Sequence, residues 1–426
     1  YLALEAFSAK DNTVKDHVYE VEVEDAGGLT ATAMATLSVK LPASGAQKCI
    51  FDKDKDNPAV MMSVMSALVY TEQAIVAVGA LDMRMAIWKL DPDHCEEPLP
   101  GWPKTIGDWT EDQALAGMVS VLKAVAVDEH GNIAIGGNFV VGGKPQRYTA
   151  FLTPDGARVW EKTGLVGEEV SSVVIAEDDL VISGGWWFTS DNPPRTDARF
   201  WRHLPDKTVW KEDLKAPFAG DPQPDPNNVR SEWIRAMLIE PETGFLVVVG
   251  EREFQPNVND VRTRAFVARF VPLGGVVGSP STSSGDAFGH DAAYSIGVCG
   301  GELIAGGWTR DAENQNAVRQ PLFRWASNGV WLEKKLPELM PSTELRGAAC
   351  DREGKVVGAG FRSAGGSDAR VFAFADPLGD RTWYETGTAG NDAANGVVCD
   401  ARGFCAWPGY RTYNGKPVAV VRVHHP

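Results

Sequence analysis

The chain has 426 residues, of which 44% are hydrophobic, and its 57 acidic against 41 basic residues give a formal net charge of −16. That charge repels phosphate backbones and anionic membrane surfaces, so it argues against nucleic acid as a partner. No apolar run is long enough to span a membrane, while 44 glycines and 26 prolines indicate many short strands joined by turns.

Residues 1–43 differ from the rest of the chain and are predicted to end an immunoglobulin-like domain. The stretch HVYEVEVEDAGGLTATAMATLSVKL alternates apolar and polar residues around a turn at Asp25-Ala-Gly-Gly, which is typical of a long β-hairpin. It resembles the closing strands of PKD-like and cadherin-like domains, which need about 100 residues in full. We therefore expect a mature or truncated start, a native protein that extends further toward the N-terminus, and a linker at residues 41–47.

An acidic stretch, FDKDKDNPAV, follows at residues 51–60. Three aspartates stand at alternate positions, as in D-x-D-x-D calcium loops: Asp52, Asp54 and Asp56. Asn57 replaces the glycine of an EF-hand, and Ser63 stands where its bidentate glutamate belongs. We interpret the stretch as a solvated charged turn. A calcium site is the alternative, and Ca²⁺ is the one cofactor that the sequence suggests.

A unit of strand, tight turn and strand recurs along the remaining chain. In VAVDEHGNIAIGG, residues 125–137, two apolar runs flank Asp-Glu-His-Gly and the second run ends in glycine. This pattern predicts a hairpin rather than a phosphate-binding loop. The glycine that ends the second run returns at a spacing of about 55 residues: Gly79, Gly137, Gly185, Gly250, Gly307, Gly360 and Gly409.

Third and fourth strands complete each unit. Runs such as MAIWKL, TAFLTP and VAVVRV are followed by a second turn and by a strand that usually carries tryptophan, which we expect to pack between neighbouring units rather than to stack on sugars: Trp160, Trp210, Trp331 and Trp383. Four strands in each of seven units predict an all-β, seven-bladed β-propeller over residues 44–426. The expected blades cover about 55–110, 111–168, 169–228, 229–287, 288–341, 342–389 and 390–426. Because the seventh unit stops after its third strand, a strand at about 46–54 is expected to complete it and close the ring.

The repeat also resembles a known family. The pattern AVDEHGNIAIGG … TAFLTPDGARVWE is similar to the propeller repeats of secreted bacterial proteins, of the delta-60 and seven-bladed-β-propeller (SBBP) type, over roughly residues 55–426. The resemblance implies a secreted or cell-surface bacterial protein with a scaffold or binding role. It brings no catalytic residues with it.

Six cysteines, none in a C-x-x-C pair, argue against zinc and thioredoxin-like chemistry and favour disulfides in an oxidising compartment. A three-residue loop around Gly403 would place Cys399 opposite Cys405, at a Cα separation that a disulfide accepts. Two buried thiols are the alternative. By elimination we also expect the pairs Cys49–Cys95 and Cys299–Cys350.

Loops between the second and third strands are long and unlike one another, and in a propeller they emerge beside the links between blades. A basic residue precedes the third strand in each unit: Arg84, Arg147, Arg199, Arg264, Arg319, Arg370 and Lys416. A ring of guanidinium groups would bind a carboxylate-bearing partner. We favour the alternative, in which each arginine pairs with a nearby acid, such as Asp197, Asp260 or Asp368, and fixes its own loop.

Aromatic residues after the repeated glycines are candidates for a ligand-binding rim: Trp186, Trp187, Trp308, Phe361 and Tyr410. GGWWF is the least repeat-like of these segments and lies beside the proline-rich loop 191–196. Packing within the loops is the alternative explanation for these rings.

Catalytic motifs such as G-x-S-x-G, H-E-x-x-H and the P-loop do not occur. We therefore predict a non-catalytic secreted or cell-surface module that binds a protein or polysaccharide with its second-to-third-strand loops. One alternative is a polysaccharide hydrolase or lyase with channel carboxylates from residues 285–293 and 391–396, and another is a structural subunit of an extracellular assembly. Two convergent carboxylates with shifted pKa values would favour the enzyme, whereas an apolar channel would favour the module.

Overall fold

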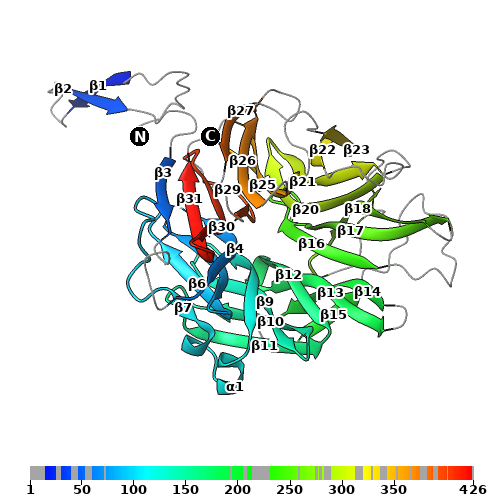
Figure 1. The fold of residues 1–426 in the computed structure, drawn as a ribbon. Helices are drawn as coiled ribbons and strands as arrows, with labels where there is room; N and C mark the ends of the chain where they lie inside the picture. The colour runs from blue at the N-terminus through cyan, green and yellow to red at the C-terminus, as the bar shows by residue number, and fades with distance from the viewer. Residues whose placement is uncertain are drawn as a thin grey trace.

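The computed structural model describes residues 15–24, 30–39, 47–52 and 60–424, with internal gaps at 72, 192–193, 205–208, 214–230, 258–259, 274–276, 278–280, 283–288, 312–319, 328–329, 336–342, 352–353, 364–366, 375–380, 387–391 and 401. These residues are nearly all in β-strands, in four-stranded antiparallel sheets set around a central opening (Figure 1). The prediction of an all-β chain of repeated sheets is therefore confirmed.

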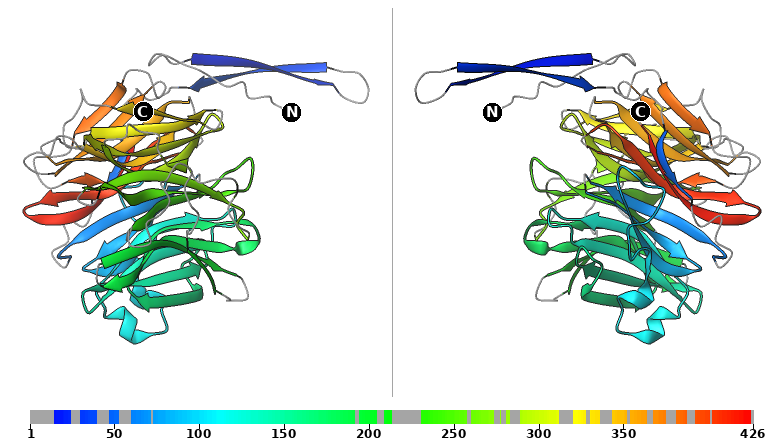
Figure 2. Two further views of the ribbon diagram at one scale, coloured as in Figure 1. Left: turned by 90° about the vertical axis from the view of Figure 1, so that its right-hand side faces the viewer. Right: turned by 90° about the vertical axis from the view of Figure 1, so that its left-hand side faces the viewer.

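The N-terminal segment is a two-stranded hairpin. β1 (Lys15–Glu24) and β2 (Thr30–Val39) pair antiparallel from Lys15↔Val39 to Glu24↔Thr30, as the alternation of their residues predicts. The hairpin projects away from the sheets of the ring (Figure 2). Its relation to an immunoglobulin-like domain stays a prediction.

Each of the first three sheets follows chain order from the central opening outward (Figure 1). The first contains β4 (Ser63–Tyr70), β5 (Ile75–Leu81), β6 (Arg84–Leu90) and β7 (Lys104–Thr105). The second contains β8 (Ser120–Val127), β9 (Ile133–Val141), β10 (Lys144–Leu152) and β11 (Arg158–Val166). The third contains β12 (Glu168–Ile175), β13 (Val181–Asp191), β14 (Pro194–His203) and β15 (Val209–Asp213).

The remaining four sheets repeat this order. The fourth contains β16 (Glu232–Ile239), β17 (Leu246–Asn257), β18 (Asp260–Phe270) and β19 (Ser281–Thr282). The fifth contains β20 (Gly289–Cys299), β21 (Glu302–Asp311), β22 (Gln320–Ser327) and β23 (Val330–Lys335). The sixth contains β24 (Thr343–Cys350), β25 (Val356–Ser363), β26 (Ser367–Phe374) and β27 (Arg381–Thr386). The last contains β28 (Ala393–Ala394), β29 (Val398–Cys399), β30 (Cys405–Tyr413), β31 (Lys416–His424) and β3 (Gln47–Phe51).

Helical structure in the described residues is limited to short segments. They are η2 (Ile106–Asp108), α1 (Gln113–Ala116) and η3 (Glu177–Asp179). Among the residues that the structure describes, no helix is long and apolar enough to cross a membrane.

The core lies between neighbouring sheets. Second strands are apolar on both faces because each sheet is covered on both sides, and Ile75–Ala80 and Ile133–Phe139 are buried without a break. Trp88, on the first sheet, is fully buried in one cluster with Val421 of the last sheet. The fourth-strand tryptophans were predicted to pack between neighbouring sheets, and Trp160 of the second sheet does so. Its ring stacks on that of His203 in the third sheet, with 5.2 Å between the ring centroids.

Residues from the two ends of the ring meet in the last sheet. β3 pairs antiparallel with β31, with Ile50 opposite Arg422 and Phe51 opposite Val421. Across the next seam, Ala419 N donates to Ser63 Oγ at 2.8 Å. Contacts between segments more than 350 residues apart in the sequence thus join the first sheet to the last.

Two disulfides link strands of the ring in the described part of the chain. Cys399 and Cys405 are bonded within the last sheet, with a Cα separation of 4.0 Å, and Cys299 and Cys350 join the innermost strands of the fifth and sixth sheets, with a Cα separation of 5.1 Å. Both predicted pairs are confirmed. Cys95 is also disulfide-bonded. The side chain of Cys49, its expected partner, lies outside the described residues.

Candidate functional site

A β-bulge interrupts the innermost strand at one equivalent place in each of the first six sheets. In the first sheet Met65 pairs with Gly79 and Ala67 with Val78, so Ser66 has no partner across the ladder. The side chain of such a bulged residue does not follow the regular alternation of side chains between the two faces of the sheet. The residues at this position in the six sheets are Ser66, Lys123, Ser171, Arg235, Tyr294 and Arg346.

The last sheet has a break where the others have a bulge. β28 ends at Ala394 and β29 begins at Val398, and Asn395 follows the residue that pairs with Gly409. Asn395 therefore occupies the position equivalent to the six bulge residues. We call these seven residues the channel residues.

The repeated glycines make this arrangement possible. A Cβ atom on Gly79 would overlap the carbonyl oxygen of Val64, two residues before the channel residue Ser66. The same overlap with the innermost strand occurs at the other glycines of the repeat: Gly137, Gly185, Gly250, Gly307, Gly360 and Gly409. Glycine is thus required because the bulged strand brings its backbone close to the second strand.

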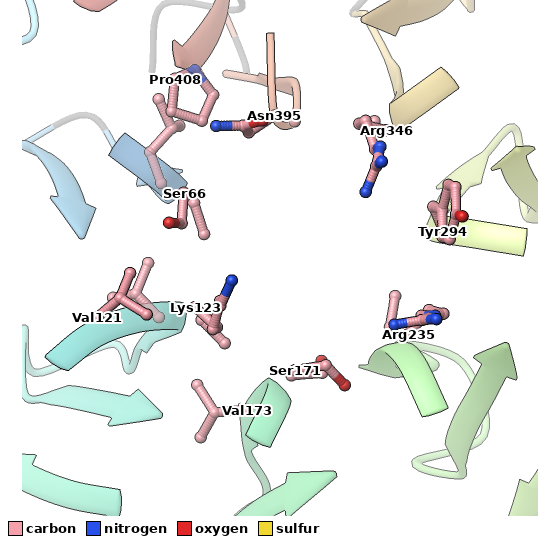
Figure 3. Close-up of a pocket in the computed structure, with 18 of the residues that line it drawn as sticks. Ser66, Val121, Lys123, Ser171, Val173, Arg235, Tyr294, Arg346, Asn395 and Pro408 are labelled. Atoms are coloured by element: carbon pink, nitrogen blue, oxygen red, sulfur yellow. The ribbon is translucent and has the colours of Figure 1, made fainter. Parts of the chain in front are cut away.

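The seven channel residues line a central cavity of about 690 Å³. Figure 3 shows them on separate innermost strands, around the open centre of the ring. Cavities of this size accommodate small molecules or short segments of a polymer. Because all seven channel residues are polar, the cavity is not the filled apolar channel that we expected to favour the non-catalytic module.

Two arginines of the cavity are held by buried carboxylates. Arg235 donates from Nε to Glu251 Oε1 at 2.8 Å, and Arg346 donates from Nη2 to Glu344 Oε2 at 2.8 Å. The side chains of Glu251 and Glu344 are 8% and 4% exposed, against 29% and 37% for their arginines. The carboxylates therefore lie behind the guanidinium groups, which keep further donors for a ligand.

Tyr294 lies between these two arginines. Its ring centroid is 5.6 Å from Arg235 Cζ and 4.4 Å from Arg346 Cζ, within the range of cation–π contacts. Burial lowers the pKa of the Arg346 guanidinium, and Arg346 Nε is a buried donor without a hydrogen-bond partner among the described residues. The fourth, fifth and sixth sheets thus present a cationic and aromatic wall.

Glu169 is the one carboxylate among the described residues that line the cavity. Burial raises its pKa, while the charges of Lys123 and Arg235 act in the opposite direction. Hydrolysis of a glycosidic bond generally needs two facing carboxyl groups. The described lining therefore does not supply the acid pair of a glycosidase.

The first two sheets contribute aliphatic side chains to the cavity in addition to Ser66 and Lys123. Met83, Val119 and Val140 line the cavity mouth and are 46%, 47% and 49% exposed. Ser120 N donates to Met83 O at 2.8 Å, and Val140 N donates to Val119 O at 3.0 Å. The second-to-third-strand loops and the link between sheets therefore meet on one face, at this mouth.

Two of the basic residues predicted from the loops, Arg147 and Arg199, form ion pairs that the structure describes. Arg147 and Arg199 both pair with Glu168, at 3.2 and 3.6 Å, in a buried cluster between the second and third sheets. Arg199 also lies over the ring of Trp187, at 4.0 Å. Of the other members, Arg84 is exposed, Arg264 and Lys416 are half-buried, and the side chains of Arg319 and Arg370 lie outside the described residues.

The predicted aromatic residues are divided between two surroundings. Phe361 lies against the cavity arginine Arg346, with its ring centroid 5.2 Å from Arg346 Cζ, and Tyr410 is half-buried on β30 of the last sheet. Trp186 instead packs edge-on against Phe188, and Trp308 is buried in the fifth sheet. The structure thus places Phe361 next to a cavity arginine but not in the cavity lining, and a ligand-binding role for the set stays a prediction.

The predicted calcium stretch is described only at its start. Asp52 accepts a hydrogen bond from Tyr413 Oη at 3.2 Å, while Asp54 and Asp56 lie outside the described residues. Within the described part of the chain, no group of three His, Cys, Asp or Glu side chains is placed to hold a metal ion. The calcium site stays a prediction.

The channel residues were not predicted, although the repeat carries a signal for them. In every unit a residue of variable type precedes a small one, as in Lys123-Ala124, Arg235-Ala236 and Asn395-Gly396. This position lies at the start of each copy, before the apolar run. A search for a position that varies in charge while its neighbour stays small would have found it.

Comparisons with known proteins give no family for the chain. Neither a protein-family model nor a curated protein matches it. Among solved structures, polysaccharide lyase Uly1 is 11% identical, with 91% of this chain and 100% of that chain covered and a TM-score of 0.49. A PL25 ulvan lyase is 8% identical (89% and 93% covered, TM-score 0.48), and the GH93 α-L-arabinofuranosidase of Fusarium graminearum is 12% identical (71% and 92% covered, TM-score 0.48). None of these likenesses assigns a function.

Proposed function

We propose that the chain is a seven-bladed β-propeller of a secreted or cell-surface protein, and that it binds its ligand in the central cavity. The seven sheets and the pairing of β3 with β31 support a closed ring of seven blades with the predicted boundaries. The disulfides support an oxidising compartment. The hairpin of β1 and β2 supports the end of an immunoglobulin-like domain before the ring.

The ligand in this proposal carries carboxylate or similar anionic groups. The supporting observation is the pair Arg235 and Arg346, each fixed from behind by a buried glutamate and both turned toward the cavity around Tyr294. Fixed guanidinium groups bind planar anions with two parallel hydrogen bonds at little entropic cost. An acidic segment of a cell-surface polysaccharide or protein has the required chemistry.

A polysaccharide lyase is the second candidate, because Tyr294 lies between two cations. In β-elimination a proton leaves the carbon next to a uronate carboxylate, the bond to the leaving oxygen breaks, and a carbon–carbon double bond forms. Arg235 and Arg346 would neutralise the carboxylate, and Tyr294 as the phenolate would take the proton from carbon and then donate it to the leaving oxygen. A hydrolase is less well supported, since Glu169 has no second carboxylate among the described lining residues.

Titration calorimetry with oligogalacturonate, oligoalginate and poly-aspartate tests this proposal. We expect salt-sensitive binding to at least one of these probes, with a loss of ten-fold or more in an Arg235→Gln, Arg346→Gln double variant. Formation of unsaturated uronate from the bound oligosaccharide would identify the lyase, and binding without turnover would identify the module. Absence of binding to all three probes, or equal binding by the double variant, would contradict the proposal.

A further inference from the structure

The turn between β5 and β6 departs from the other turns of its kind. Asp82 and Met83 both have left-handed backbones, with φ of 48° and 64°. Two equivalent turns use residues suited to that conformation: Gly142-Gly143 in the second sheet and Asn414-Gly415 in the last. A left-handed backbone costs a residue with a side chain roughly 1–2 kcal/mol, and methionine lacks the local hydrogen bonds that help Asn and Asp.

Hydrogen bonds explain why an aspartate occupies position 82, whereas no comparable interaction explains the methionine at position 83. Asp82 Oδ1 accepts hydrogen bonds from Met61 N and Met62 N, at 2.7 and 3.0 Å. The backbone carbonyl of Met83 accepts a hydrogen bond from Ser120 N, and a residue of any type could accept it. Its side chain is 46% exposed, so burial does not offset the backbone cost. Strain of this kind concentrates at sites where a side chain is needed for binding.

Met83 belongs to a continuous aliphatic surface. Met83, Val119 and Val140, which we call the aliphatic lip, are each about half exposed and are linked through backbone hydrogen bonds of their segments. All three line the mouth of the same cavity whose other wall carries Arg235, Tyr294 and Arg346. The site therefore combines apolar side chains on the side of the first two sheets, where Lys123 is the one channel cation, with two arginines on the opposite side.

We infer that the aliphatic lip is the second half of the binding site, and that its ligand is a polypeptide segment with an aliphatic side chain next to acidic ones. This inference rests on the proposed function. Methionine and valine side chains adapt well to aliphatic side chains. A sugar ring on the same surface would lose water from its hydroxyl groups without gaining partners. The lip therefore favours a protein partner over a polysaccharide.

Two blocked peptides of equal charge test the inference: Asp-Leu-Asp-Leu-Asp and Asp-Gly-Asp-Gly-Asp. We expect the wild-type protein to bind the leucine peptide about ten-fold more tightly, as burial of one aliphatic side chain predicts. Met83→Gly should remove about three-fold or more of that preference while raising the melting temperature, because glycine accepts the left-handed turn. Val140→Ser should reduce the preference in the same way.

The outcomes separate this inference from the proposed function. Val159→Ser, at a 47% exposed position on β11 outside the cavity lining, is the control and should leave the preference unchanged. Equal binding of both peptides, or a higher melting temperature of Met83→Gly with an unchanged preference for the leucine peptide, would refute the inference that the aliphatic lip binds the ligand. If both peptides still lose affinity in Arg346→Gln, the anionic site stands. If binding is confined to oligogalacturonate, the ligand is a polysaccharide and the inference fails.

Discussion

The side chain of Asn395 donates a hydrogen bond from Nδ2 to the carbonyl oxygen of Met65, at 2.7 Å. Asn395 stands at the break in the innermost strand of the last sheet, and Met65 directly precedes the bulge residue Ser66 of the first sheet. One of the contacts between the last and the first sheet is therefore also a contact between two positions that shape the cavity.

Asn395→Ala should lower the free energy of unfolding by about 1 kcal/mol, the usual net value of one hydrogen bond. Ser66→Ala changes the neighbouring cavity surface and leaves the Asn395–Met65 bond intact, so it is the matched control. Denaturant unfolding measures both variants. Equal stability of Asn395→Ala and the wild-type protein would show that this bond does not hold the seam.

Gly250→Ala should destabilise the fold by about 2–3 kcal/mol. The added methyl group would overlap the carbonyl oxygen of Trp233 and would lie 3.0 Å from the ring of Phe266, so the bulge or the core must shift. Gly117→Ala is the control, because its nearest neighbour would be a carbonyl oxygen at 4.0 Å. Thermal unfolding should show a large decrease for Gly250→Ala alone, and a decrease of the same size in both variants would refute the requirement for glycine at the bulge.

Glu168→Gln should cost about 3–5 kcal/mol of stability, because it removes the buried negative charge that pairs with the guanidinium groups of both Arg147 and Arg199. Glu111→Gln removes the partner of Arg158 on the surface, where Glu111 is 81% exposed, and should cost less than about 1 kcal/mol. Urea denaturation of the two variants makes the comparison. Similar small losses in both would mean that the Glu168 cluster does not fix the second sheet to the third.

His203 should make the fold less stable in acid. Burial lowers the pKa of its imidazole from 6.5 to about 3, with Ser183 Oγ at 3.0 Å from Nε2 and Trp160 stacked on the ring. Between pH 6.5 and about 3 the unfolded chain binds the proton that the folded chain does not, so stability falls as the pH falls through this window. The contribution is on the order of 1 kcal/mol for each pH unit.

The variant His203→Phe keeps an aromatic ring beside Trp160 and cannot take up this proton. Chemical denaturation at a series of pH values should therefore give a shallower loss of stability in acid for His203→Phe than for the wild-type protein. Parallel pH profiles would contradict a neutral buried His203.

The repeat in the sequence is sufficient to predict the sheets, because hairpins and their turn glycines are local features. Cys399 and Cys405 could be paired for the same reason, since they face each other across one short loop. The arginines were harder to place, because Glu168, the acid that pairs with both Arg147 and Arg199, lies at the start of the third sheet, 21 and 31 residues away in the sequence. Pairing between sheets depends on their packing, which a local pattern does not contain.

The channel residues were not predicted because they share the bulge position in each sheet but differ in residue type. Lys123, Tyr294 and Asn395 have no common chemistry, so no residue motif links them, and only the bulge brings them to the cavity. Met83 was missed because its significance lies in a backbone angle. Aromatic residues after the repeated glycines were easier to find, and one of them, Phe361, does lie against Arg346.

The central claim is that the bulge arginines form an anion-binding site in the ring. Its most direct test is the affinity of the wild-type protein and of Arg346→Gln for the leucine–aspartate peptide, each measured at low and at high salt. The account predicts tight binding that weakens with salt in the wild-type protein and a loss of ten-fold or more in the variant. Binding that is insensitive both to salt and to the loss of Arg346 would contradict it.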